Sequence, residues 1–180
     1  MKVTILSSQN TNIDEVYLNT SQKIIDYLTN IPNIELNWGS GTASIMGLCY
    51  EAFSKKGLPI HGFTTPKYID LINDLPNADH KIYDNTFLLK QHLYQDTDFI
   101  VILPGGIGTV SELLSFLEEA RSNDDAKPII IYNETGIFDS TINLLNDLIN
   151  NKFNNPNVLD YLTIANNLEE FDSIIKRVNS

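Results

Sequence analysis

The stretch that decides the fold runs from Phe99 to Glu112 and reads Phe-Ile-Val-Ile-Leu-Pro-Gly-Gly-Ile-Gly-Thr-Val-Ser-Glu. Asp98–Leu103 is predicted to be a strand, because its apolar run is typical of strands buried on both faces of a parallel sheet. Glycines follow at once, and Val110–Arg121 is predicted to be a helix. The start of such a helix has unpaired N–H groups and a positive dipole end, so this turn can bind an anion such as phosphate.

The same alternation of short apolar strands and helices extends in both directions. The other expected strands are Lys2–Leu6, Ile34–Trp38, Ile60–Phe63, Ile129–Tyr132 and Leu162–Ile164. The other expected helices are Asp14–Asn30, Ile45–Lys56, Asn85–Gln95, Asp139–Asn150 and Leu168–Val178. Pro66–Asp84 has weak periodicity, and we expect it to be mostly irregular with a short strand at Lys81–Tyr83. The pattern predicts a single α/β domain over residues 1–180, with a Rossmann-like, doubly wound, mostly parallel sheet and helices on both faces.

Composition narrows the function. The chain has 180 residues, a formal net charge of −11 and one cysteine. Nucleic-acid binding is disfavoured because it needs a clustered basic surface. One cysteine excludes an internal disulfide framework and fits a reducing compartment. The sequence shows neither a signal peptide nor an apolar run long enough for a bilayer, so we expect a cytoplasmic protein without membrane contact.

A second glycine cluster, Gly39-Ser40-Gly41, precedes another predicted helix that contains Met46-Gly47. In a parallel sheet, two turns that both follow strands lie at the same edge and can enclose a ligand between them. The first turn lacks the lysine of a P-loop and the Gly-x-Gly-x-x-Gly spacing of a dinucleotide site. A nucleotide that is neither hydrolysed like ATP nor bound like NAD is therefore the favoured ligand.

Several residues of the first turn suit this ligand. Gly105 and Gly106 are expected to allow positive φ and close approach of the backbone. Thr109 can donate a hydroxyl hydrogen to a phosphate, and Glu112 lies one helical turn further on, within reach of an attached sugar. The alternative is structural: the glycines serve tight strand–helix packing, and Thr109 and Glu112 form a capping box.

Together the two turns resemble those of the LOG ("lonely guy") family, whose members are cytokinin riboside 5′-monophosphate phosphoribohydrolases. The resemblance rests on Gly-Ser-Gly with Met46-Gly47 and on Pro-Gly-Gly-Ile-Gly-Thr-Val-Ser-Glu, and it covers nearly the whole chain. It implies hydrolysis of the N-glycosidic bond of AMP or an N6-modified AMP to a free base and ribose 5-phosphate. It implies Glu112 and Lys90 as catalytic residues, and substrate binding by Gly105, Gly106, Gly108, Thr109, Gly39, Ser40, Gly41, Met46, Ser7 and Ser8.

The chain also departs from the family pattern. Family members usually carry an Arg-Lys pair on the helix before the Pro-Gly-Gly strand, and these positions are Leu89 and Lys90 here. Ser111 replaces the usual acidic residue before the catalytic glutamate. Leu89 leaves three alternatives: a slower enzyme, a different nucleotide, or a non-catalytic carrier such as the related molybdenum-cofactor carrier proteins. Lys90 or Arg121 is a candidate for supplying the missing charge.

The resemblance further implies a homodimer and no cofactor. The apolar residues Phe87, Leu88 and Leu89 on one predicted helix fit burial against both the sheet and a second copy. We expect no metal site, because His61, His80 and His92 have no ligand spacing to one another or to Cys49.

Overall fold

The computed structural model describes residues 1–72, 75, 77–122 and 126–178. Within them, seven strands form one sheet in the order β4-β3-β2-β1-β5-β6-β7, and every pairing is parallel. The strands are β1 (Lys2–Leu6), β2 (Glu35–Trp38), β3 (Ile60–Thr64), β4 (Asp79–Ile82), β5 (Phe99–Ile102), β6 (Ile129–Tyr132) and β7 (Leu162–Ala165). The predicted α/β fold is confirmed.

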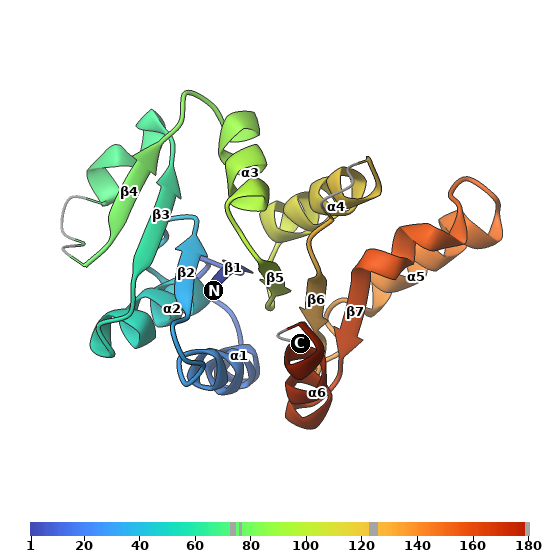
Figure 1. Cartoon of the computed structure of the whole chain (residues 1–180), viewed down its shortest axis with the longest axis horizontal. Coiled ribbons are helices and arrows are strands. Elements are labelled where there is room, and N and C mark those ends of the chain that lie inside the picture. The colour runs from blue at the N-terminus through green and yellow to red at the C-terminus, as the bar shows by residue number, and fades with distance from the viewer. Residues whose placement is uncertain (73–74, 76, 123–125, 179–180) are drawn as a thin grey trace.

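Helices cover both faces of the sheet, with α1, α2 and α6 on one face and α3, α4 and α5 on the other (Figure 1). They are α1 (Glu15–Leu28), α2 (Ser44–Lys55), α3 (Thr86–Gln95), α4 (Ile107–Ser122), α5 (Asp139–Asn150) and α6 (Leu168–Val178), with 3-10 helices at Pro66–Leu71 and Pro156–Tyr161. Each face has its own apolar core: Trp38, Phe53 and Phe171 belong to the first, and Leu93 and Phe116 to the second. The strands are buried because both faces are covered.

Most element bounds lie within two residues of the sequence-based expectations, and three differences concern the sheet edge and the glycine motif. Pro66–Leu71 is a 3-10 helix inside a range that was expected to be mostly irregular. The edge strand β4 begins at Asp79, two residues before its predicted start, and its pattern is weak because it pairs with one neighbour, β3. Helix α4 begins at Ile107 instead of Val110, because the Val110 N–H already bonds the Gly106 carbonyl at 3.0 Å. The glycine motif is therefore partly helical.

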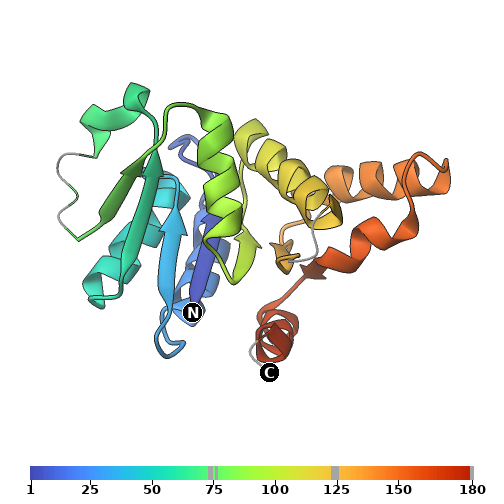
Figure 2. The ribbon, with the colours of Figure 1, turned by 45° about the horizontal axis from the view of Figure 1, so that its top comes forward.

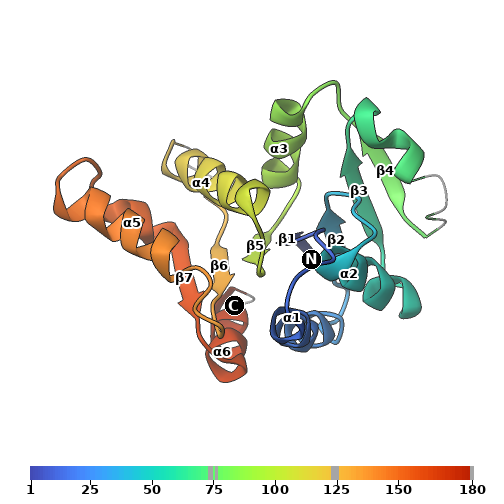
Figure 3. The same cartoon turned by 180° about the vertical axis from the view of Figure 1, so that it is seen from behind.

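The strand order reverses at β1, whose two neighbours are β2 and β5. From β1 the chain builds outward through β2, β3 and β4, and it then returns to build the other half from β5. Ligands of open α/β sheets bind beyond the carboxyl ends of the strands at such a switch point. In Figures 2 and 3, α3 and α4 lie side by side next to this point.

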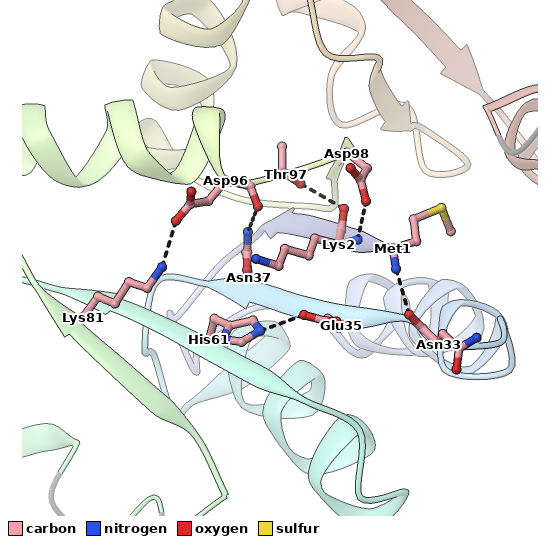
Figure 4. Close-up of polar contacts among 10 residues, drawn as sticks. All are labelled: Met1, Lys2, Asn33, Glu35, Asn37, His61, Lys81, Asp96, Thr97 and Asp98. Carbon is pink, nitrogen blue, oxygen red and sulfur yellow. Dashed lines mark hydrogen bonds and ion pairs between the residues drawn. The ribbon is translucent and has the colours of Figure 1, made fainter.

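The link between α3 and β5 is fastened to the sheet by side chains (Figure 4). Lys81 on β4 forms an ion pair with Asp96 at 2.8 Å, and the Asp96 carbonyl accepts a hydrogen bond from Asn37 on β2 at 2.8 Å. The Lys2 N–H donates to the Asp98 carboxylate at 2.7 Å. These contacts fix the end of α3, and with it the orientation of the helix that carries Leu89 and Lys90.

In the part of the chain that the structure describes, none of the helices has the length and apolar character needed to cross a bilayer.

Candidate nucleotide site

Three loops meet beyond the carboxyl ends of β1, β2 and β5. The Ser8 N–H donates to the Pro104 carbonyl at 3.0 Å, which joins the β1 loop to the β5 loop. The Met46 N–H donates to the Ser8 carbonyl at 3.1 Å, which joins the start of α2 to the same point. Because these bonds are between backbone groups, the relative positions of the loops depend little on side-chain identity.

The loops enclose one side of a cavity of about 500 Å³. The residues that line it are Ile5, Leu6, Ser7, Ser8, Gln9, Asn10, Gly39, Ser40, Met46, Phe63, Thr64, Thr65, Tyr68, Thr86, Leu89, Lys90, Leu93, Gly106, Ile107, Gly108, Thr109 and Glu112. Most of the predicted site residues are thus brought together. The exceptions are Gly41, Gly105 and Arg121, which do not line this cavity.

Gly105 shapes the first turn through the absence of a side chain. A Cβ there would collide with the Thr109 side chain, whose hydroxyl donates to the Ser7 carbonyl at 3.3 Å. The expectation that Gly105 and Gly106 adopt positive φ is wrong, since Gly57 and Gly136 are the glycines with positive φ in the described chain. Glycine here provides space instead: a Cβ on Gly106 or Gly108 would meet no atom within 4 Å. The first turn of α4 is therefore open to a ligand.

Glu112 lies one turn into α4, half-buried in the cavity wall. Burial raises the pKa of its carboxyl to about 7, and the positive charge of Lys90 opposes part of that rise. Lys90 extends from α3, and its ammonium donates to the Ser111 hydroxyl at 2.9 Å. A carboxyl with a pKa near neutrality exists in both protonation states at pH 7, which suits a group that accepts or donates a proton.

The capping-box alternative is not what the structure shows. Helix α4 begins at Ile107, so Thr109 lies inside the first turn rather than at the N-cap, and its hydroxyl bonds the Ser7 carbonyl. Glu112 instead lines the cavity.

The second turn places Ser40 in the cavity wall with a φ of +58°. Gly39 and Gly41 leave room for the Met46 side chain: a Cβ on Gly41 would lie 2.7 Å from Met46 Sδ, and one on Gly39 would lie 3.1 Å from Met46 Cε. Met46 therefore packs under this turn and reaches the cavity.

Sequence reasoning found Leu89 and Lys90 on α3, but it missed the part of the wall formed by β3, the 3-10 helix after it and Leu93. Tyr68 gives this part exposed apolar surface, Phe63 and Leu93 are lining residues that are fully buried, and Thr64 and Thr65 add hydroxyl groups. A signal was present, because Phe63-Thr64-Thr65 follows a third strand whose carboxyl end faces the same edge. The turn has no glycine, so it did not stand out.

Arg121 is not part of this cavity. It forms an ion pair with Glu118 on the same helix and lines a separate surface cleft with Lys152 and Phe153. Nine residues separate it from Glu112, about 13 Å along a helix. The interpretation of Arg121 as a compensating cation therefore finds no support in the structure, and Lys90 is the cation that lines the cavity among the described residues.

Across the described residues, no three His, Cys, Asp or Glu side chains gather in a group that could hold a metal ion.

Solved structures of the same fold cover almost the whole chain. The molybdenum cofactor binding protein of Rippkaea orientalis matches with a TM-score of 0.71 and 15% identity over 99% of this chain and 97% of that one. The molybdenum cofactor carrier protein of Chlamydomonas reinhardtii matches with a TM-score of 0.71 and 12% identity over 99% and 97%. At these identities the likeness shows the fold alone.

Sequence relatives are more specific. The cytokinin riboside 5′-monophosphate phosphoribohydrolase of Mycobacterium tuberculosis is 29% identical over 142 residues, 75% of this chain and 73% of that protein. The enzyme of the same name, LOG3, from Arabidopsis thaliana is 26% identical over 77% of this chain and 65% of its own length. A probable rice enzyme, LOGL6, is 26% identical over 74% of this chain and 54% of its own length, so the chain spans little more than half of it.

The family model described as possible lysine decarboxylase matches residues 46–174, which include Met46, Lys90 and the whole glycine turn up to Glu112. This range is most of the chain, and the relatives with the phosphoribohydrolase name match over similar shares of it. The chain therefore belongs to the LOG family.

Proposed function

We propose that the protein is a phosphoribohydrolase that cleaves the N-glycosidic bond of a purine nucleoside 5′-monophosphate, AMP or an N6-modified AMP, to a free base and ribose 5-phosphate. The observation that carries the proposal is the position of Glu112, a half-buried carboxyl with a pKa of about 7, one turn beyond an open helix N-terminus in the same cavity wall. The names of the sequence relatives support the same reaction.

The start of α4 is the place for the 5′-phosphate. Residues 106–109 line a cavity that no side chain blocks at Gly106 or Gly108, and the first turn of a helix has N–H groups without intrahelical partners that can bind an anion there. The Thr109 hydroxyl donates to the Ser7 carbonyl, which holds the side chain at this spot. Backbone donors and a helix dipole bind phosphate in a protein whose net charge is −11, because the attraction is local.

Glu112 then faces the ribose. Cleavage of the bond between C1′ and the base gives the sugar oxocarbenium character and leaves the electron pair on the base. The Glu112 carboxylate stabilises this charge or takes a proton from the attacking water, and the oxygen of that water forms the new bond to C1′. The departing base takes up a proton, so that one water supplies the hydroxyl on C1′ and the hydrogen on the base. Lys90 keeps part of the carboxyl population ionised, since its charge lowers the pKa that burial raises.

The apolar part of the wall is the place for the base. Tyr68 and Leu89 offer aromatic and aliphatic surface, and among the described residues this wall has no charged side chain other than Lys90 and Glu112 at its boundary. Leu89, at the position of the family arginine, adds to this apolar surface. An uncharged purine, with or without an apolar N6 substituent, suits such a wall.

Leu89 also keeps a second function open. Without the family arginine, the same cavity could hold a nucleotide or a phosphorylated cofactor without cleaving it, as the carrier proteins of the same fold hold theirs. The acid–base character of Glu112 favours hydrolysis, because a carrier has no need of a carboxyl near neutrality in this position.

The test is chromatographic detection of free base from AMP, N6-isopentenyl AMP, GMP and CMP. Wild type, Glu112→Gln and Glu118→Gln are compared, since Glu118 is an exposed carboxylate on the same helix. We expect base release from an adenine nucleotide by wild type and Glu118→Gln, and a loss of about 10²–10⁴-fold in Glu112→Gln. Binding without base release by wild type would refute hydrolysis and favour the carrier.

The homodimer remains a prediction from the resemblance. Phe87 on α3 is 76% exposed and Ile107 at the start of α4 is 88% exposed, so apolar surface lies beside the cavity. Sedimentation of the protein as a monomer at micromolar concentration would contradict it. The cytoplasmic location likewise remains a proposal.

A further inference from the structure

His80 lies on the edge strand β4, outside the cavity wall, and makes a contact with it. Its Nδ1 is 3.2 Å from the Ser40 hydroxyl oxygen, and the two residues are 40 positions apart in the sequence. Ser40 lines the cavity at the turn after β2. A histidine of the sheet edge is thus hydrogen-bonded to a residue of the cavity wall.

The neighbouring strand makes room for this contact. A Cβ on Gly62 of β3 would collide with both His80 Nδ1 and Ser40 Oγ. The His80 ring also packs against Trp38, with ring centroids 5.8 Å apart. The Trp38 indole in turn donates to the Gly41 carbonyl at 2.9 Å. His80 and Trp38 therefore support the turn from behind, one through Ser40 and the other through Gly41.

This support matters because the backbone of Ser40 has a conformation that is unfavourable for a residue with a side chain. Its φ of +58° lies in the left-handed region, which costs a residue other than glycine free energy unless the surroundings fix it. Ser40 is 5% exposed, so its hydroxyl needs a partner inside the protein. His80 is that partner, and the hydrogen bond offsets part of the strain.

The imidazole is suited to this role in its neutral form. Burial lowers the pKa of His80, although the nearby Asp79 carboxylate opposes the shift. Nε2 is buried and has no hydrogen-bond partner among the described residues. Ser40 is therefore the polar group that the structure gives to this ring, and a neutral ring can serve it as donor or acceptor.

We propose that His80 is a positioning residue that holds the Ser40 hydroxyl and the Gly39–Gly41 turn in the conformation that binds the nucleotide. The inference rests on the proposed function for the identity of the ligand, and the conformational part of it holds for the ligand-free protein. Replacing His80 therefore loosens the turn first and weakens nucleotide binding as a consequence.

The experiment compares His80→Phe, His80→Asn and the control His61→Phe, each also combined with Ser40→Gly. Phenylalanine keeps a ring against Trp38 but has no nitrogen, whereas asparagine places a polar atom close to the position of Nδ1. His61 lies on β3, bonds Glu35 at 2.9 Å and does not line the cavity. The readouts are amide hydrogen exchange of residues 39–46 without ligand, the Kd for AMP, and Tm.

We expect His80→Phe to speed exchange of this segment and to weaken AMP binding by roughly three- to tenfold, the effect of one lost hydrogen bond. His80→Asn restores most of both, and His61→Phe changes neither. In the Ser40→Gly background the His80→Phe effect shrinks to less than twofold, because glycine tolerates positive φ without support. If His80 had only a general structural role, His80→Phe would lower Tm, and its effect on AMP binding would be the same with Ser40 and with Gly at position 40.

Two results would overturn the proposal: unchanged exchange in His80→Phe, or a His80→Phe effect that is equally large in the wild-type and the Ser40→Gly backgrounds. Failure of wild type to release base or to bind AMP would instead refute the proposed function. The exchange data would still decide the role of His80 in that case, so the two failures are distinguishable.

Discussion

The two turns that face each other across the cavity are built differently. In the turn after β5, Gly105 gives space to Thr109 four residues later, and the helix begins within the motif. In the turn after β2, Ser40 has a φ of +58° and its support comes from His80 on another strand. Both turns are joined to distant parts of the chain, the first through the Ser7 and Ser8 backbone. The first turn contains no residue with positive φ, whereas the second contains one, Ser40, whose hydroxyl depends on the His80 side chain.

This difference bears on how each turn responds to change. Thr109 is β-branched and its side chain has few rotamers, so it cannot move aside to make room for a Cβ on residue 105. Met46 under the second turn is unbranched and adaptable. The second turn should therefore tolerate substitution better than the first, and the predictions below test this contrast.

The largest effect is expected from a matched pair of substitutions, Gly105→Ala and Gly41→Ala. The new Cβ meets the Thr109 side chain in one case and, at 2.7 Å, the Sδ of Met46 in the other. We expect Gly105→Ala to lower the free energy of unfolding by about 1–3 kcal/mol and to weaken AMP binding at least tenfold. Gly41→Ala should cost less than half as much. Urea denaturation and calorimetry measure both, and equal effects would contradict the contrast.

The next prediction concerns Glu112 in the ligand-free protein. Its pKa is raised from 4.5 to about 7, so the folded state holds a proton that the unfolded state releases in this range. The contribution of Glu112 to stability therefore falls as pH rises from about 4.5 through 7, by roughly 1–3 kcal/mol. Glu112→Gln should be more stable than wild type at pH 8 and nearly equal at pH 4.5. A difference that does not grow with pH, in urea denaturation at several pH values, would contradict the burial argument.

The third prediction concerns the effect of Lys90 on the pKa of Glu112. Its charge lowers the pKa of Glu112, so Lys90→Met should raise that pKa and move the acidic limb of the pH–rate profile upward by about one unit. The matched control is Ser115→Ala, because Ser115 is exposed on α4 and its hydroxyl bonds the Ser111 carbonyl. Base release measured between pH 5 and 9 checks the shift, and an unmoved limb in Lys90→Met would remove Lys90 from the site.

The smallest effect is expected at the far end of α4. Arg121→Ala breaks an exposed ion pair with Glu118, and such a pair contributes little to stability because water and salt screen it. Base release and AMP affinity should stay within twofold of wild type. A larger change would restore Arg121 as a compensating cation and would require movement of α4.

Much of the fold was predictable, because strands buried on both faces are continuous apolar runs. β5 and β6 are such runs, and the bounds of α5 and α6 agree with their predicted ranges. The edge strand β4 was placed two residues late, since Asp79–Ile82 is half exposed and its pairing with β3 leaves little apolar signal. The local hydrophobic pattern therefore predicts the central strands of such a sheet more accurately than the edge strands.

The sequence predicted those parts of the site whose residues lie close together along the chain. The glycine turn and Glu112 lie within eight residues, and their order along the chain already places them at one cavity. The wall formed by Phe63 and Tyr68 and the support of Ser40 by His80 depend on which strands are neighbours. His80 has no motif, so only the pairing of β3 with β4 reveals its partner.

The most direct test of the central claim is a crystal structure of Glu112→Gln with AMP. We predict that the phosphate binds the backbone N–H groups at residues 106–109, that C1′ of the ribose faces residue 112, and that the base lies against Tyr68 and Leu89. A nucleotide bound outside this cavity, or one with its base at the start of α4 and its phosphate near Tyr68, would contradict the account.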